Sequence, residues 1–206
     1  MTGRKKFKIQ RSLGIELPGL GKPGALKKRN YPPGQHGRQR SRKTSAYGEQ
    51  LREKQKLLFH YGIREEQLRR FVRKARSTSP SNWIDSLIAL LERRLDNVVF
   101  RLGFARSIAH ARQIVSHGHI LVNGRRQTIG SMILRLGERI HLTEKARQFI
   151  AIGTSRENPR LTLPSYLQLE DAGAGIGMVI AFPGPEHVPF EFNKTQVAEY
   201  YAKRGV

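Results

Sequence analysis

Apolar residues recur three and four positions apart through three consecutive stretches of the chain, as on one face of an α-helix. The stretches cover roughly residues 49–61, 65–76 and 87–102. Glycines follow the first and the third, and the polar segment 77–82 separates the second from the third. The repeating positions are Leu51, Leu58 and Tyr61; Leu68, Phe71, Val72 and Ala75; and Leu87, Leu91, Leu95, Val98 and Leu102. The pattern therefore predicts three amphipathic helices, the third continuous as far as Gly103.

Beyond Gly103 the pattern changes to shorter elements. Ser107 can cap a helix over residues 108–117, and Asn123-Gly124 between apolar segments is a strong signal for a β-hairpin. Further short strands are expected at 133–134, 140–142, 161–163, 167–169 and 178–180, with a closing helix at 197–203. The predicted fold class is α+β: mainly helical at first, then a small antiparallel sheet, then a final helix.

The first 45 residues show no sustained period. They are rich in Gly, Pro, Lys and Arg, and contain a single acid, Glu16. Such a segment cannot bury enough apolar surface to order itself alone. It is either a disordered tail or an arm that becomes ordered on RNA. Leu13, Leu17 and the turn at Pro32-Pro33-Gly34 favour the arm.

The charge of the chain indicates a polyanionic partner. The 206 residues hold 38 Lys and Arg against 16 Asp and Glu, for a net charge of +22. Residues 1–155 hold 33 basic and 10 acidic side chains, whereas residues 156–206 hold 5 and 6. Within residues 69–76, five cations stand without an acid, which is repulsive unless something anionic lies against them.

The composition also excludes several classes of protein. The chain has no cysteine, so disulfides and cysteine-based metal sites are ruled out, and a reducing compartment fits. No apolar run approaches the roughly 18–20 residues that a membrane span needs. The basic N-terminus lacks the apolar stretch of a secretory signal. Binding to a membrane surface could use the same charge, but the large apolar helix faces favour a protein core.

The segment between Arg93 and Gly124 combines a buried face with a cationic one. Two short helices would share an apolar face, and their other face and the hairpin would then display Arg and polar side chains to a partner. Duplex RNA hides its base edges, so proteins recognise its phosphates, 2′-hydroxyls and shape, and guanidinium groups at set separations suit that task. Replacing Arg106 and Arg112 with alanine is expected to weaken RNA binding without unfolding the protein.

Other residues favour structural roles. His117 and His119 could suggest a metal, but with no cysteines or nearby carboxylates they are interpreted as turn and RNA-facing residues. Asp96 is expected to pair with Arg93 or Arg94 rather than act as a catalyst. The alternating glycines of 173–177 lack the context of a nucleotide-binding loop. Trp83, Phe59 and Phe71 are expected in the core rather than as stacking platforms for bases.

The same residues carry a resemblance. Residues 93–124 resemble the S-four-type RNA-binding module, which occurs in several families. The stretches Tyr31-Pro32-Pro33-Gly34-Gln35-His36-Gly37, Tyr47-Gly48-Glu49-Gln50-Leu51-Arg52-Glu53-Lys54-Gln55-Lys56 and Val197-Ala198-Glu199-Tyr200-Tyr201 extend the resemblance over most of the chain. They are similar to bacterial members of the family of the fourth protein of the small ribosomal subunit.

This resemblance implies a domain organisation and a set of contact residues. Residues 1–45 would form a basic arm, residues 46–92 a helical domain completed by 185–206, and residues 93–184 the inserted module with its sheet. The expected RNA-binding residues are Arg29, Tyr31, His36, Arg38, Arg52, Lys54, Lys56, Arg69, Arg70, Arg73, Arg94, Asn97, Arg101, Arg106, Ser107, Arg112, His117, His119, Asn123 and Arg125.

The resemblance also implies a function. The chain is expected to be a cytoplasmic, non-enzymatic component of the small ribosomal subunit, monomeric before assembly and without a cofactor. It would bind a junction in the 5′ domain of 16S ribosomal RNA, nucleate assembly, adjoin the fifth small-subunit protein, lie near the messenger entry path and influence decoding accuracy.

Two features depart from the family. Many relatives carry an N-terminal cysteine cluster that can hold zinc. This chain has none, so no structural metal is inferred, and RNA contact would have to order the arm around Lys5 to Lys28. Residues 129–132 replace a Pro-Ser-Tyr run found in many relatives, which leaves the exit of the hairpin open.

Two other classes of function use the same module. An RNA-modifying enzyme would need a separate catalytic domain, and the matched stretches leave no room for one. A free RNA chaperone fits the charge but does not account for resemblance along the whole chain.

Overall fold

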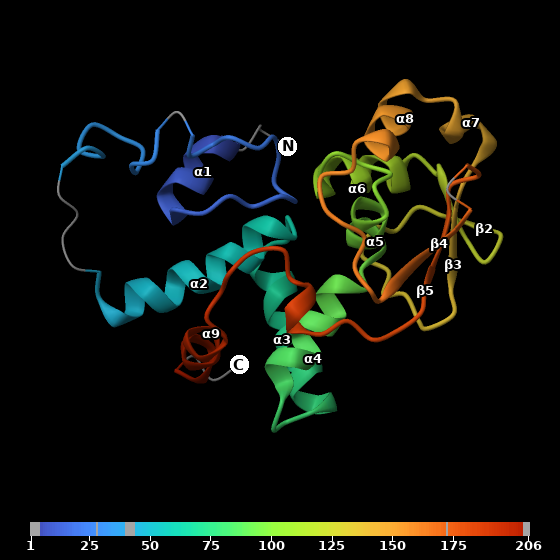
Figure 1. Ribbon diagram of the computed structural model, residues 1–206. Coiled ribbons are helices and arrows are strands. Elements are labelled where there is room, and N and C mark those ends of the chain that lie inside the picture. Colours follow the sequence, from blue (N-terminus) through green and yellow to red (C-terminus); the bar gives the residue numbers. More distant parts are fainter. Residues whose placement is uncertain (1–4, 28, 40–43, 172, 204–206) are drawn as a thin grey trace.

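The computed structural model describes residues 5–27, 29–39, 44–171 and 173–203, and within them a mainly helical half lies beside a half built on a sheet (Figure 1). This arrangement confirms the α+β class. The elements of the helical half are α1 (Lys6–Leu13), α2 (Ala46–His60), α3 (Glu65–Thr78), α4 (Trp83–Glu92), η1 (Pro185–His187) and α9 (Lys194–Ala202). The elements of the other half are α5 (Leu95–Arg101), α6 (Ile108–Ser116), β1 (Ile120–Val122), β2 (Arg125–Gln127), β3 (Arg139–Leu142), α7 (Glu144–Arg147), α8 (Ile150–Glu157), β4 (Leu167–Asp171) and β5 (Ile176–Val179).

The strands form one antiparallel sheet in the order β2-β1-β3-β5-β4. The hairpin predicted at Asn123-Gly124 is confirmed, since β1 and β2 pair there with Val122 opposite Arg125. Both turn residues have positive φ, 49° and 77°, as a tight hairpin turn requires. Alternate residues of β1 and β3 (Ile120, Val122, Ile140 and Leu142) are buried against α5 and α6 and join the core.

The prediction of one continuous helix through Leu102 was wrong, because the helix breaks at Arg93 and Arg94. The backbone N–H groups of Leu95 and Asp96 donate to the carbonyls of Met132 and Gly130, at 2.8 and 3.0 Å. The backbone N–H of Leu134 in turn donates to the carbonyl of Arg93, at 2.9 Å. The loop after the hairpin thus supplies hydrogen-bond partners that the preceding helical turn would otherwise provide, and it sets the direction of α5.

Three other predicted details differ. Residues 133–134 make an isolated bridge between Ile133 and Arg94 rather than a strand, and residues 161–163 have no regular structure. The sequence did not predict α7 and α8, which follow β3 in the chain; α8 lies beside α6 at the top of the sheet half in Figure 1. These two helices are too short for their apolar residues to form a recognisable helical repeat.

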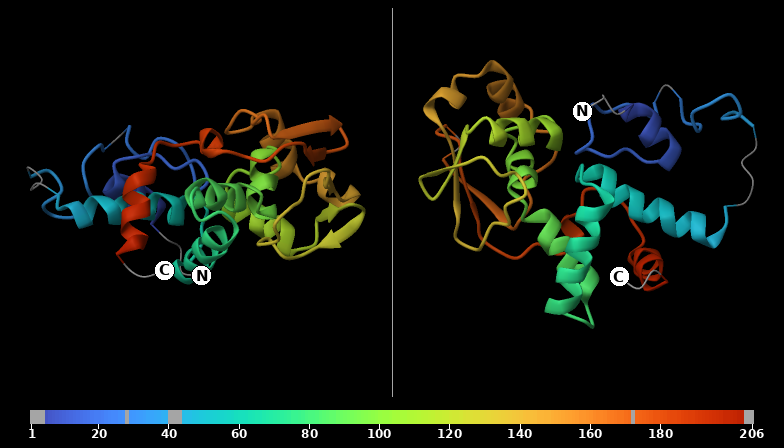
Figure 2. Two further views of the ribbon diagram at one scale, coloured as in Figure 1. Left: turned by 90° about the horizontal axis from the view of Figure 1, so that it is seen from below. Right: turned by 180° about the vertical axis from the view of Figure 1, so that it is seen from behind.

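The last segment of the chain returns from the sheet to the helical half, as both views in Figure 2 show. There α9 lies against α2: the rings of Tyr47 and Tyr200 stack with centroids 6.0 Å apart, and the amide of Gln50 donates to Glu199 at 2.6 Å. Val197, Tyr200 and Tyr201 of α9 are buried. The buried side chains of both halves belong to one continuous core. None of the helices in the described part of the chain combines the length and apolar character that spanning a bilayer requires.

The N-terminal arm packs against the protein over residues 5–27, and whether RNA contact is needed to order it stays a prediction. Leu17, Leu20 and Ala25 are buried. The backbone of Gly19 accepts from the N–H of Ile108, at 3.0 Å, and donates to the His60 ring, at 3.4 Å. A Cβ on Gly19 would lie 2.6 Å from Ile108 and 2.7 Å from the His60 carbonyl, so only glycine permits this close approach.

Candidate nucleic-acid interface

The predicted RNA-binding residues divide into exposed, half-buried and buried groups. The exposed ones are Arg29, His36, Arg38, Arg52, Arg70, Arg73, Arg106, His117, Asn123 and Arg125. The half-buried ones are Tyr31, Lys56, Arg69, Arg112 and His119. The buried ones are Lys54, Arg94, Asn97, Arg101 and Ser107. Each residue of this last group is held by contacts within the protein, which favours an indirect role over direct contact with RNA.

Helix α3 presents cations along its exposed side. Leu68, Val72 and Ala75 are buried against the core, so Arg70, Arg73 and Lys74 project outward. Two acids one turn earlier, Glu65 and Glu66, pair with Arg69 and Arg70 at 3.5 and 3.7 Å. Solvent-exposed pairs of this kind hold their partners weakly, about 0–1 kcal/mol. The arginines of α3 therefore remain available to a stronger anionic partner.

The second exposed group lies on α6 and the hairpin. Ser107, predicted to bind RNA, instead caps α6 by accepting the His110 N–H at 3.2 Å. The Asn123 side chain accepts the backbone N–H of Arg139, at 2.9 Å, which holds the hairpin tip against β3. Arg125 and Arg106 remain exposed at opposite ends of this segment. The module thus carries its outward cations on a rigid helix–hairpin frame.

Arg94 and Arg112 bind the same buried carboxylate. Asp96, fully buried, accepts two hydrogen bonds from Arg94, at 3.0 and 2.7 Å, and two from Arg112, at 3.0 and 2.6 Å. The expected pairing of Asp96 with Arg94 is thereby confirmed. Arg112 also donates to the backbone carbonyls of Tyr61 and Gly62, at 3.3 and 3.0 Å. Because these carbonyls follow α2, Arg112 links the module directly to the helical half.

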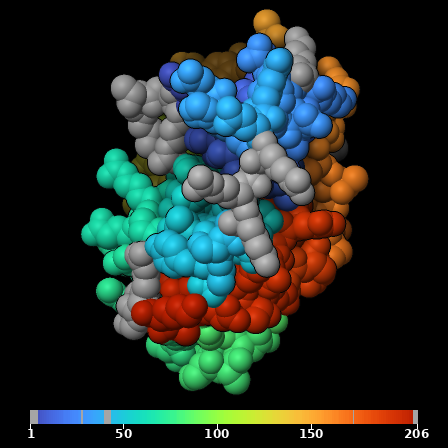
Figure 3. Space-filling model, turned by 90° about the vertical axis from the view of Figure 1, so that its left-hand side faces the viewer, coloured from blue at the N-terminus to red at the C-terminus, as the bar shows by residue number. Residues whose placement is uncertain are grey.

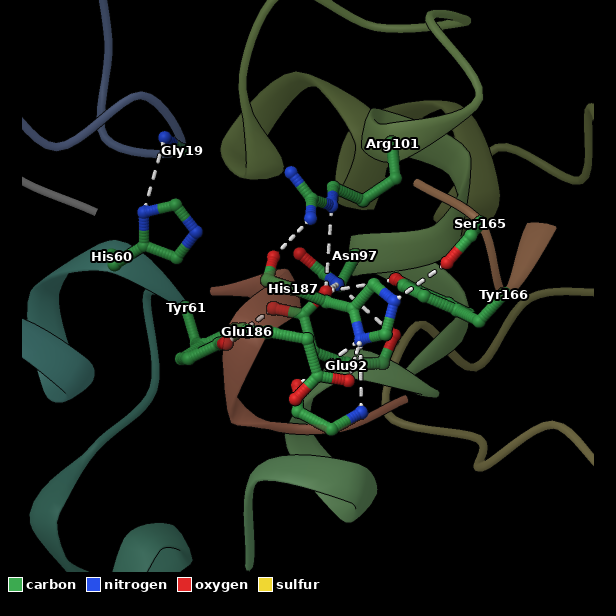
Figure 4. A network of polar contacts seen from close by, with 11 residues as sticks. Gly19, His60, Tyr61, Glu92, Asn97, Arg101, Ser165, Tyr166, Glu186 and His187 are labelled. Atoms are coloured by element: carbon green, nitrogen blue, oxygen red, sulfur yellow. Dashed lines mark hydrogen bonds and ion pairs between the residues drawn. The ribbon is translucent and has the colours of Figure 1, made fainter. Parts of the chain in front are cut away.

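A second buried acid, Glu92, is the partner of the Asn97 and Arg101 side chains, which point toward it (Figure 4). Its carboxylate accepts from the Asn97 amide at 2.9 Å and lies 3.4 Å from the Arg101 guanidinium. The hydroxyl of Tyr61 donates to the same carboxylate, and that of Tyr166 does so at 2.8 Å. Arg101 also donates to the backbone carbonyl of His187 in η1.

This network fixes the junction between the two halves. Burial, together with the nearby Glu92 carboxylate, raises the pKa of both Tyr61 and Tyr166 well above the ordinary value, so both remain hydroxyl donors. The four side chains around Glu92 come from the end of α2, from α5 and from the start of β4. Removing one donor from a buried charge costs about 1–3 kcal/mol or more, so the network resists rearrangement.

Two predicted contact residues on α2 hold the helical half together. Lys54, 6% exposed, pairs with Glu65 at 2.7 Å and lies over the Tyr200 ring at 4.9 Å. Lys56 pairs with Glu53 at 2.6 Å and donates to the carbonyl of Glu191 at 3.2 Å. These contacts tie α2 to α3 and to the segment before α9, so neither amine is free for phosphate.

The arm lies beside α2 on the face seen in Figure 3, and it carries cations of its own. The guanidinium of Arg38 lies over the Tyr31 ring, 5.3 Å from the centroid, and that of Arg11 lies 4.9 Å from the same ring. Arg11 also donates to the Tyr31 carbonyl at 2.9 Å. The arm, α2 and α9 are contiguous on this face of the molecule.

Two features of the site escaped sequence reasoning. No pattern in the sequence singles out His60, yet it is fully buried and its ring accepts the backbone N–H of Gly19 in the arm. The role of Glu92 could not be predicted from nearby residues, because its partners Tyr61 and Tyr166 lie 31 and 74 residues away in the chain. The rings of His117 and His119 are 6.2 Å apart, and no group of three or more potential metal ligands occurs among the described residues.

The fold and the cationic frame define a protein of the RNA-binding S4-domain class. Residues 93–140 match the family described as "S4 domain", and residues 2–92 match "Ribosomal protein S4/S9 N-terminal domain". A protein of Bdellovibrio bacteriovorus named small ribosomal subunit protein uS4B is 54% identical over 97% of this chain and 96% of its own length. Proteins named uS4 from Thermosynechococcus vestitus and Methylobacillus flagellatus are 47% and 44% identical, each over 97% of this chain and 96% of their own length. The chain belongs to the uS4 family of small ribosomal subunit proteins.

Proposed function

We propose that this chain is a structural, non-enzymatic component of the small ribosomal subunit in the bacterial cytoplasm, and that it binds 16S ribosomal RNA. Family membership over nearly the whole chain supports the assignment to the subunit. The relatives carry the names of ribosomal proteins and not of enzymes.

The observation that carries the proposal is a set of exposed arginines held on one rigid frame. Arg70 and Arg73 project from α3, and Arg106 and Arg125 from the module, while Asp96 and Glu92 fix the two halves relative to each other. Cations at set separations recognise the shape of a folded RNA, whereas a flexible basic tail would only supply charge. The cations of the arm add a third part to this surface.

The RNA-facing residues that we propose are therefore the accessible members of the predicted set. They are Arg29, Tyr31, His36, Arg38, Arg52, Arg69, Arg70, Arg73, Arg106, Arg112, His117, His119, Asn123 and Arg125. Lys54, Lys56, Arg94, Asn97, Arg101 and Ser107 would act indirectly, by holding that surface in place.

The finer role is part of the same proposal. The chain would bind a multi-helix junction in the 5′ domain of 16S RNA early in assembly, adjoin the fifth small-subunit protein, lie near the messenger entry path and influence decoding accuracy. The buried contacts between the two halves support early binding, because RNA binding need not supply the free energy that holds the halves together.

Filter binding of the full chain to a 5′-domain transcript, across a range of salt concentrations, tests the proposal. If about eight phosphates are neutralised, the log–log slope should be about −6 to −7, since each contact contributes about −0.7 to −0.9. A control transcript of equal length should bind at least tenfold more weakly. Equal affinity for the two transcripts would refute the specificity.

Two further measurements separate the alternative functions. A free RNA chaperone would sediment with bulk RNA rather than with small subunits in a sucrose gradient. An RNA-modifying enzyme would change bases in ribosomal RNA, which mass spectrometry of the digested RNA would detect.

A further inference from the structure

A groove separates the start of α3 from the loop that follows β2. Arg64 and Arg70 line it from the α3 side, Thr128 and Ser131 from the loop, and Arg94 and Arg112 also line it. Its volume is about 470 Å³, within the range of about 300–1,000 Å³ typical of ligand sites. Four guanidinium groups from separate parts of the chain thus share one hollow.

The groove retains positive charge after its internal pairs are counted. Asp96 is fully buried and shared between Arg94 and Arg112, so one carboxylate offsets two cations. Glu66, which also lines the groove, is 80% exposed and stands 3.7 Å from Arg70, a separation that binds it weakly. Four arginines therefore face two carboxylates, and the first turn of α3 adds the partial positive charge of a helix N-terminus.

A buried donor in the groove wall has no partner. Arg94 is 2% exposed, and its Nη1 makes no hydrogen bond with any described residue. Nitrogen donors buried without a partner are rare in folded proteins, because each costs about 1–3 kcal/mol. Because this nitrogen is itself buried, Arg94 adds positive charge to the groove wall without donating directly to an anion in the groove.

We propose that this groove binds a phosphate group of the RNA backbone, held jointly by the two halves of the molecule. The inference rests on the proposed RNA-binding function and gives that function one specific contact. Arg64 and Arg70 would reach the phosphate from α3. Arg112 would contact it from the module while its remaining N–H groups stay bound to Asp96 and to the carbonyls of Tyr61 and Gly62.

The joint arrangement makes the site dependent on the geometry of the junction. Arg112 is oriented by Asp96 and by backbone atoms that follow α2. Its position therefore depends on how the module is placed relative to the helical half. A phosphate in the groove would stabilise that relative placement, and a changed placement would separate Arg112 from Arg64 and Arg70. This contact would therefore favour RNA whose fold places a phosphate where both halves of the protein can reach it.

The test uses the exposed residues Arg64 and Arg70, whose replacement leaves the core intact. R64Q, R70Q and the double variant are titrated by filter binding against the 5′-domain transcript, with R147Q on α7 as a matched control for loss of one exposed charge. Each groove variant should weaken binding roughly three- to tenfold. Because both side chains serve one phosphate, the double variant should lose less than the product of the single effects.

The salt dependence gives a second readout. The slope should become shallower by about 0.7–0.9, one phosphate contact, in the double variant as well as in each single variant. R147Q combined with R64Q should show multiplicative effects. Wild-type affinity in R64Q and R70Q, or independent losses of two contacts in the double variant, would overturn the groove site.

Two further outcomes have a defined meaning. If R64Q binds RNA normally but loses millimolar binding of inorganic phosphate in calorimetry, the ligand is a free phosphate compound and the RNA contact is wrong. If the wild-type chain binds the 5′-domain and control transcripts equally while R64Q weakens both, the groove is supported and the proposed specificity for small-subunit RNA fails.

Discussion

Lowering the pH should reduce the free energy of unfolding through His60, which lies where the arm meets the end of α2. The side chain is fully buried, and Nδ1 accepts the Gly19 N–H at 3.4 Å, so the ring is neutral in the folded protein. Burial, with a smaller contribution from the charge of Arg101, lowers the pKa of His60 from 6.5 to about 3. In the unfolded chain the same ring titrates normally.

The direction and size of the effect follow from these two pKa values. Above pH 6.5 the ring is neutral in both states and stability does not depend on it. As the pH falls from 6.5 toward 3, the unfolded chain gains a proton that the folded protein does not bind, so each unit costs about 1.4 kcal/mol. The expected loss between pH 7.5 and pH 5.5 is about 1.4 kcal/mol, before most carboxylates begin to titrate.

Urea unfolding of the full chain and of His60→Leu at both pH values measures this contribution. The variant leaves the Gly19 N–H without its acceptor, which costs about 1–3 kcal/mol at either pH and does not alter the difference between them. His110 and His119, whose pKa values burial also lowers, are present in both proteins and cancel. The wild-type chain should therefore lose about 1.4 kcal/mol more than the variant. Equal losses would refute the assignment of a neutral, buried His60.

Three further predictions concern the junction and the arm. Tyr61→Phe removes one hydroxyl donor from the buried Glu92 carboxylate and should lower the free energy of unfolding by about 1–3 kcal/mol, measured by urea denaturation; an unchanged midpoint would contradict the network. Gly19→Ala places a Cβ 2.6 Å from Ile108 and should detach the arm, so that limited proteolysis cuts residues 5–27 faster than in the wild-type chain; equal rates would show that the arm adapts. Arg112→Ala should destabilise the fold by about 3–5 kcal/mol, because it removes half the donors of a buried carboxylate, whereas the exposed Arg106→Ala should change RNA affinity alone. Thermal melts and filter binding of both variants separate these outcomes, and equal melting temperatures would contradict the role of Arg112.

The last of these predictions revises an expectation drawn from the sequence. Arg106 and Arg112 looked equivalent there, since both were expected among the cations displayed on the outward face of the module. In the structure Arg106 is exposed, while Arg112 binds Asp96 and two backbone carbonyls that lie 50 and 51 residues earlier. No local pattern distinguishes the two, because what distinguishes them is a contact between distant segments.

Elements that depend on nearby residues were predicted well. The apolar repeat placed α2, α3 and α6 to within a few residues, and the Asn123-Gly124 dipeptide placed the β1–β2 hairpin. Their signals are local: side-chain periodicity, a capping serine and a turn that requires positive φ. The break before Leu95 could not be found in this way, because the competing carbonyls belong to Gly130 and Met132.

The prediction of a solvent-facing polar side on α5 was wrong for a related reason. Asn97 and Arg101 were assigned outward because the apolar repeat left them on the other side of the helix, yet every residue of α5 is buried. A helix between two parts of a protein has no solvent face, and its polar residues must then find partners inside. Glu92 is a partner of both residues, and Arg101 also donates to the backbone carbonyl of His187.

The distribution of paired and unpaired arginines indicates how the molecule separates folding from binding. At the junction, Glu92 holds Arg101, and Asp96 holds Arg94 and two of the four hydrogen bonds of Arg112, so these cations stabilise the relative position of the two halves. On the surface, Glu66 is exposed and weakly paired with Arg70, so this arginine loses little when a phosphate replaces the carboxylate. Affinity for RNA should therefore depend on α3, the hairpin and the arm, whereas the choice among RNA shapes should depend on residues that never contact RNA. A variant of Glu92 or Asp96 that still folds would be expected to keep its salt-dependent affinity and lose its preference for one folded RNA.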